Sequence, residues 1–157
     1  MIINQKDWKY QHLGTDFFCS SECVIKGIES YQTSDSINPD KKYKSSPISG
    51  VEIGSNHFYS KKLHRRFRSD YEVKVAEFFD TRSINFRYEP YCFELGRQTL
   101  TPDFYIDPPY DCFVEVKGAF SIGGKAKLTK FLAVYPEVNY IFIPWTLRED
   151  FYCDTYC

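Results

Sequence analysis

The sequence has little that indicates a membrane-bound or secreted protein. Its 157 residues include one methionine, and the longest apolar run, YIFIPW at 140–145, is far shorter than a membrane-spanning helix of ~20 residues. The first eleven residues, MIINQKDWKYQ, are polar. We therefore expect no signal peptide, no membrane partner and a cytoplasmic location. A reducing compartment favours thiols or a metal site over disulfides for the six cysteines.

The chain also lacks an excess of basic charge. Lysine and arginine total 20 against 21 acidic residues, giving a net charge of −1, so charge must be examined locally before any nucleic-acid partner is inferred. Aromatic residues are abundant, with 14 Phe and 13 Tyr, and the hydrophobic fraction of 43% excludes global disorder. A chain of this length forms one ordinary domain.

The pattern of residues changes near position 60. Residues 32–60 are rich in Ser, Asn, Asp, Pro and Gly, so we expect residues 1–60 to be an irregular N-terminal extension and 61–157 to be the core. Periodicity in the core predicts a helix after Ser69, a strand at 84–95 with a break at Pro90, strands at 100–106 and 112–118, a helix at 121–136 and a strand at 139–145. This order predicts an α/β fold with a mixed sheet flanked by helices.

Charged residues stand inside two of the predicted strands. In CFVEVKG, alternation puts Phe113, Glu115 and Lys117 on one face. Asp103 lies among apolar residues of LTPDFYI, and pairing of the two strands would bring Asp103 and Glu115 together. Two carboxylates and a backbone carbonyl suit Mg²⁺, and a nearby lysine can orient water. The alternative is that Glu115 and Lys117 form a surface pair on a solvated face.

The order of these residues resembles a known nuclease signature. Pro102-Asp103 followed by Glu115-Val116-Lys117 looks like the PD-(D/E)XK motif, and FRSDYEVKVAEFFDTRSINFRYEP resembles the preceding helix and strand in phage junction-resolving and transposon-end nucleases. The resemblance covers about 68–145. It implies a restriction-endonuclease-like fold and an endonuclease dependent on Mg²⁺ or Mn²⁺, encoded by a phage or mobile element, that hydrolyses DNA and selects branched substrates. A location in the host cytoplasm and a homodimer are expected by the same analogy.

The resemblance also implies residue roles. Asp103 and Glu115 would be the metal-holding carboxylates, and the backbone carbonyl of Val116 would be another ligand. Lys117 would position the attacking water and offset charge in the transition state. Glu72 would be the helix glutamate that reaches the same metal or a second one.

Glu72 has a structural alternative. Ser69-x-x-Glu72 is a capping box, in which the glutamate bonds back to the start of its own helix. Glu77, five residues later, is a competing helix acid with a solvated position as its simplest interpretation. The sequence alone does not choose between these two acids.

Basic residues gather in two segments. KKLHRRFR at 61–68 carries five cations and no acid, and three lysines lie on the helix predicted after the strand at 112–118. We expect these residues to contact DNA phosphates, with a solvated surface as the alternative. They are Lys61, Lys62, Arg65, Arg66, Arg68, Lys125, Lys127 and Lys130.

Two C-x₃-C pairs lie at opposite ends of the chain. Cys19 and Cys23 form one pair, and Cys153 and Cys157 form the other. Four thiolates suit a closed, structural Zn²⁺ site that would fasten the N-terminal segment to the core. The alternatives are unligated thiols or disulfides, and Cys92 and Cys112 lie in strand contexts typical of the core.

Two other classes of function remain open at this point. The first is a DNA-binding or adaptor protein that has a nuclease-like fold but no activity. The second is a zinc-stabilised interaction module, which would contain zinc, unfold with a chelator and not bind DNA.

Overall fold

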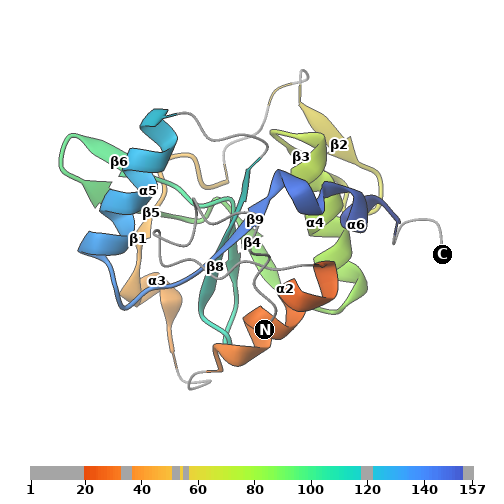
Figure 1. Cartoon of the computed structure of the whole chain (residues 1–157), viewed down its shortest axis with the longest axis horizontal. Helices are drawn as coiled ribbons and strands as arrows, with labels where there is room; N and C mark the ends of the chain where they lie inside the picture. The colour runs from red at the N-terminus through yellow and green to blue at the C-terminus, as the bar shows by residue number, and fades with distance from the viewer. Residues whose placement is uncertain (1–19, 33–36, 51–53, 55–56, 118–121, 154–157) are drawn as a thin grey trace.

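A computed structural model describes residues 20–32, 37–50, 54, 57–117 and 122–153. A four-stranded sheet with the order β4-β7-β8-β9 lies at its centre (Figure 1). The strands are β4 (Phe86–Tyr88), β7 (Phe104–Ile106), β8 (Cys112–Lys117) and β9 (Asn139–Pro144). β7 is antiparallel to both β4 and β8, whereas β9 runs parallel to β8 after helix α5 (Ile122–Val134). The predicted mixed sheet flanked by helices is confirmed.

The two faces of the sheet carry different layers (Figure 1). One face packs against helices, which are α4 (Asp70–Thr81), α2 (Ser21–Ser30) and α6 (Arg148–Cys153). The other packs against α5 and a small sheet, which consists of β1 (Lys44–Ser45), β5 (Tyr91–Leu95) and β6 (Gln98–Leu100). The apolar residues between the sheet and helices α4, α2 and α6 form one cluster, the α4 core, and those between the sheet and α5 form another, the α5 core. Val114 and Val116 of β8 lie in the α4 core, and Phe113 lies in the α5 core. The predicted alternation along this strand is therefore confirmed.

Helix α4 follows Ser69 as predicted. The Ser69 hydroxyl accepts a hydrogen bond from the Glu72 backbone N–H at 3.1 Å and so caps the first turn. Tyr71, Val75 and Phe78 recur at helical spacing and are at most 4% exposed. Burial of each such side chain contributes about 1.5–3 kcal/mol, so packing holds the helix in place. Neither α4 nor any other helix in the described ranges is long and apolar enough to cross a membrane.

The single strand predicted at 100–106 is wrong in its extent. β6 ends at Leu100 and pairs with β5, whereas β7 begins at Phe104 and pairs with β4 and β8. Pro102 lies between them, and it has no N–H to contribute to a sheet ladder. The break places Asp103 at the start of β7, on the border between two sheets.

The described part of residues 20–60 is more regular than its loop-like composition predicts. Val24 and Ile28 of α2 are fully buried in the α4 core. Helix α3 (Pro39–Lys42) and strand β1 follow, and β2 (Phe58–Ser60) pairs with β3 (Arg65–Phe67). The polar residues serve as caps; for example, the Asn38 side chain accepts a hydrogen bond from the Asp40 N–H. The division proposed at residue 60 therefore falls inside a β-hairpin.

Candidate active site

Asp103 and Glu115 lie at one end of the central sheet. β7 and β8 pair with Phe104 opposite Val114, and the same register continued by one residue places Asp103 opposite Glu115. The Asp103 carboxylate accepts a hydrogen bond from the Val116 backbone N–H at 2.7 Å, which fixes it against β8. Residues directly opposite each other on antiparallel strands have Cβ atoms about 4.5–5.5 Å apart. The structure therefore brings the two predicted carboxylates together.

Both of these acids are buried. Asp103 is 9% exposed and Glu115 is 4% exposed. The alternative of a solvated surface position is therefore wrong for Glu115, which shares the α5 face of the sheet with Phe113. Two adjacent buried carboxylates are costly unless hydrogen bonds or cations offset their charge. Such pairs are typical of functional sites.

The backbone beside the acid pair suits a ligand role. The N–H and C=O of a residue in a strand point toward the same neighbouring strand, so the Val116 carbonyl faces the Asp103 side, as its N–H does. The β7–β8 register continued by two residues places Val116 opposite Pro102, which has no N–H to donate to that carbonyl. Lys117 is the last residue of β8, and its side chain lies outside the part of the molecule that the structure describes.

Glu72 takes part in a capping network at the start of α4. Its carboxylate accepts hydrogen bonds from the Ser69 hydroxyl at 2.8 Å, the Arg68 backbone N–H at 3.2 Å and the Tyr88 hydroxyl. Burial and the nearby Glu72 carboxylate raise the pKa of Tyr88, which therefore remains a hydrogen-bond donor. The capping interpretation of Glu72 is confirmed, because its carboxylate bonds back to the start of its own helix. The backbone N–H that it accepts from is that of Arg68, not that of Ser69.

The two helix acids contact groups on the α4 side of the sheet. Tyr88, the partner of Glu72, belongs to the α4 core, whereas Glu115 shares the opposite face with Phe113 by alternation. Across the described ranges, no three His, Cys, Asp or Glu side chains are grouped to hold one metal ion. Glu77 is partly buried, not solvated as expected, and accepts a hydrogen bond from the Ser60 hydroxyl at 2.7 Å.

Glu89 is not among the predicted site residues, but it adjoins Asp103. The Glu89 backbone N–H donates to the Asp103 carbonyl at 2.8 Å. The buried Glu89 carboxylate accepts hydrogen bonds from two nitrogens of the Arg68 guanidinium, at 2.7 and 3.2 Å, and this interaction raises the pKa of Arg68. Glu89 has a φ of 48°, in the left-handed region that residues other than glycine rarely adopt. Such strained positions cluster at functional sites.

Tyr140 is a further residue of this region that sequence reasoning missed. It lies on β9 opposite Phe113, and it is 4% exposed. Burial raises the pKa of the Tyr140 hydroxyl well above its usual value, and the carboxylates of Glu115 and Asp103 raise it further. A tyrosine in an apolar strand carries no signal of such a neighbourhood, because only the sheet register reveals it.

The β2–β3 hairpin carries the predicted basic segment beside α4 (Figure 1). Most of its cations interact with the protein: Lys62 with Asp80, Arg65 with the rings of Phe67 and Tyr88, Arg66 with the ring of Tyr59, and Arg68 with Glu89. Tyr59 is half exposed and lies opposite Arg66 in the hairpin, while Lys61 is exposed near the turn. On α5, Lys130 donates to the Leu95 carbonyl at 2.7 Å, and Lys125 and Lys127 are exposed and half-buried respectively.

The helices that carry one cysteine of each C-x₃-C pair are adjacent. The Ser21 N–H at the start of α2 donates to the Asp150 carboxylate of α6 at 3.2 Å. Cys23 lies on α2 as a half-buried thiol, and Cys153 ends α6. Cys19, Cys157 and the Cys153 side chain lie outside the described residues. Cys92 and Cys112 are buried, as predicted.

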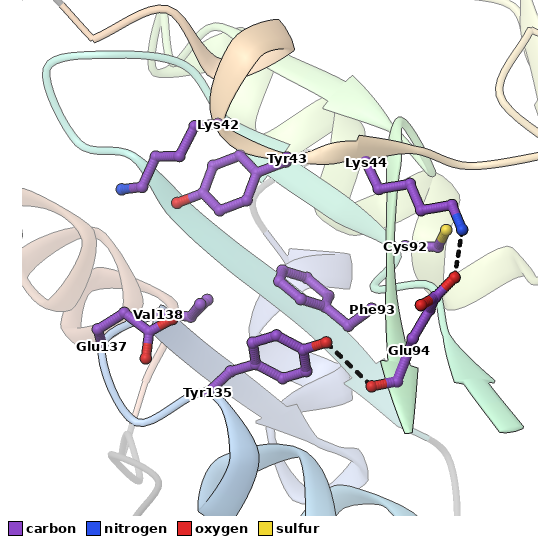
Figure 2. A pocket seen from close by; sticks show the side chains of 9 residues that line it. All are labelled: Lys42, Tyr43, Lys44, Cys92, Phe93, Glu94, Tyr135, Glu137 and Val138. Atoms are coloured by element: carbon purple, nitrogen blue, oxygen red, sulfur yellow. Dashed lines mark hydrogen bonds and ion pairs between the residues drawn. The ribbon is translucent and has the colours of Figure 1, made fainter. Parts of the chain in front are cut away.

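A separate cavity of about 290 Å³ opens between α3, β5 and the segment after α5 (Figure 2). Tyr43, Phe93 and Tyr135 contribute its aromatic lining. An ion pair between Lys44 and Glu94 borders it. Neither acid of the central pair lines this cavity, so it is distinct from the candidate active site.

Part of the chain is similar to two phage nucleases. It is 31% identical over 90 residues to Endonuclease I of Escherichia phage T7 and 29% identical over 92 residues to Endodeoxyribonuclease 1 of Enterobacteria phage T3. These matches cover 55% and 56% of this chain. The chain spans 59% of the length of either relative. No family model matches the chain, and no solved structure matches it.

Proposed function

We propose that this chain is a DNA endonuclease with Asp103 and Glu115 at its catalytic centre. The observation that carries the proposal is the buried pair of carboxylates held opposite each other, Asp103 just before β7 and Glu115 in the second half of β8. The similarity to the T7 and T3 enzymes supports it independently. The order Pro102-Asp103 and Glu115-x-Lys117 on two neighbouring strands supports membership of the PD-(D/E)XK superfamily.

The donor set fits Mg²⁺ or Mn²⁺. Mg²⁺ in nucleotide-processing sites is commonly held by one or two carboxylates, with water and substrate phosphate oxygens as its other ligands. Asp103, Glu115 and the Val116 carbonyl would supply the protein's share, so a third acid is not required. When bound there, the ion would offset negative charge on the scissile phosphate.

The remaining roles belong to Lys117 and Glu72. We assign Lys117 to orienting the water that attacks phosphorus in line with the leaving 3′ oxygen. The new bond joins this water oxygen to phosphorus, the P–O3′ bond breaks, the water gives up one proton to solvent, and the 3′ oxygen takes up one proton from solvent. Products would carry a 3′-hydroxyl and a 5′-phosphate. Glu72 accepts three hydrogen bonds, and a carboxylate offers about four lone-pair sites, so it keeps capacity for a ligand on the α4 side.

The β2–β3 hairpin is the proposed DNA-contacting arm. Arg66 and Lys61 would bind backbone phosphates, with Lys125 and Lys127 on α5 as a second contact. The half-exposed Tyr59 ring beside Arg66 can stack on an unpaired base, which favours branched DNA over continuous duplex. Arg66 also donates to the His57 carbonyl at 3.1 Å and would bind phosphate with its remaining N–H groups. Lys62, Arg65, Arg68 and Lys130 also interact with protein groups, and we expect their contribution to DNA affinity to be secondary.

The biological setting follows from the relatives. Because they are phage enzymes, we propose a phage or mobile-element origin and action in the host cytoplasm. A homodimer would place two acid pairs on one branched substrate and allow both strands to be cut.

We also propose that a zinc ion joins the two ends of the chain. The contact between α2 and α6 places Cys23 and Cys153 on adjacent elements, and Cys19 and Cys157 complete a set of four thiolates. Such a site would be structural, because all four coordination positions are filled by protein.

Cleavage assays test the proposed activity directly. Purified protein is incubated with supercoiled plasmid, linear duplex and a four-way junction, with Mg²⁺ or with EDTA. We expect Mg²⁺-dependent cutting, fastest on the junction, that is lost in Asp103→Ala and Lys117→Ala. Lys26→Ala, on the exposed side of α2, is the matched control and should retain full activity. A folded wild type that cuts none of the DNA substrates would refute the proposal.

A further inference from the structure

The Tyr140 hydroxyl is a buried polar group in an unusual place. Parallel pairing sets Tyr140 beside Phe113, two residues before Glu115 along β8 and on the same face of the sheet. The Tyr140 ring packs against the Phe131 ring of α5, with centroids 5.1 Å apart, so the helix side of the sheet holds the side chain in place. Its hydroxyl oxygen is fully buried, and it has no hydrogen-bond partner in the described structure.

A buried hydroxyl of this kind calls for an explanation. Leaving such a group without a hydrogen bond is costly, and phenylalanine would fill the same space without that cost. Burial, and then the nearby carboxylates of Glu115 and Asp103, raise the pKa of the Tyr140 hydroxyl and keep it protonated. The group next to this acid pair is therefore a hydrogen-bond donor.

We propose that Tyr140 is a positioning residue for the acid pair, which donates its O–H to the Glu115 carboxylate when that carboxylate binds a divalent cation. The proposal rests on the metal-dependent function proposed above. A carboxylate that turns one oxygen toward a cation presents its other oxygen to the protein, where a fixed donor orients it. Partners of this kind typically change metal affinity 10- to 100-fold.

Removal of the single hydroxyl tests this role. In Tyr140→Phe, we expect about tenfold weaker binding of Mn²⁺, measured by calorimetry on the DNA-free protein. Thermal unfolding in EDTA should show no loss of stability. The cleavage rate should fall at limiting Mn²⁺ and recover at high Mn²⁺, with unchanged junction affinity in EDTA.

Tyr105→Phe is the matched control. Tyr105 lies on the same face of the sheet, and its hydroxyl donates to Asp111 at 2.7 Å, away from the acid pair. This variant should lose stability and keep wild-type Mn²⁺ affinity. Equal Mn²⁺ affinity and equal cleavage in wild type and Tyr140→Phe would overturn the positioning role. Absence of Mn²⁺ binding by the wild type would overturn the metal-dependent function, and the role of Tyr140 with it.

Discussion

Replacing Asp103 with asparagine should stabilise the protein while abolishing its activity. The side chain keeps its shape, and the asparagine oxygen can still accept the hydrogen bond from the Val116 N–H. What disappears is one of two carboxylates that face each other in a buried part of the sheet. The same carboxylate is needed for a cation, so stability and function should change in opposite directions.

The size of the effect can be estimated. Two unit charges about 5 Å apart repel by about 3 kcal/mol at an effective dielectric constant near 20. Loss of the charged acceptor weakens the Val116 hydrogen bond by about 1 kcal/mol. The net stabilisation is therefore about 1–2 kcal/mol. For a domain of this size, that gain raises the Tm by roughly 2–8 °C.

Thermal unfolding with and without Mg²⁺ measures both parts of this prediction. In EDTA, Asp103→Asn should melt above the wild type. At a Mg²⁺ concentration ten times the Kd, the wild type should gain about 1.4 kcal/mol from binding, and the variant should gain far less. Junction cleavage by the variant should be absent.

Asp111→Asn is the matched control. Asp111 is also buried, but its carboxylate accepts hydrogen bonds from Tyr43 and Tyr105 and pairs with Lys42. Asparagine there should destabilise the protein and leave the response to Mg²⁺ unchanged. If Asp103→Asn is no more stable than the wild type in EDTA and gains equally from Mg²⁺, the acid pair is not a cation site.

Three further predictions follow from other parts of the structure. Arg66→Ala should weaken junction binding severalfold in a low-salt filter-binding assay, and loss of its hydrogen bond to the His57 carbonyl should lower thermal stability by about 0.5–1.5 kcal/mol. Because burial raises the pKa of Tyr71, Tyr88 and Tyr105 above that of unfolded tyrosine, the free energy of unfolding in denaturant titrations should fall above pH 10, by up to about 1.4 kcal/mol per pH unit for each tyrosine. Metal analysis should find one zinc per chain, and Cys23→Ser should abolish it; a zinc-free, stable wild type would exclude that site.

Local sequence patterns predict α4 and β8 well, because each has a complete signal within a few residues. Ser69 marks the start of the helix, and alternation in CFVEVKG separates Glu115 from its apolar neighbours. The split of 100–106 into two strands is harder to foresee, because it depends on which sheets accept Leu100 and Phe104. The β2–β3 hairpin escaped prediction because a three-residue strand is too short to show a period.

The candidate site shows the same division between local and long-range information. Asp103 and Glu115 are recognisable because charged residues interrupt apolar strands. The position of Glu89 beside Asp103 is not recognisable, because it depends on a backbone hydrogen bond to Asp103 and on Arg68, 21 positions away. Tyr140 depends on the parallel register that α5 makes possible.

Several features that oppose stability adjoin Asp103. They are two buried acids, a left-handed glutamate and a buried tyrosine hydroxyl. Each of these features costs free energy that a purely structural sheet could avoid. Their presence around Asp103 is expected where selection acts on chemistry rather than on packing, because function is the usual reason that a sequence departs from local rules. Burial of apolar side chains in the α4 core and the α5 core offsets the free-energy cost of these features.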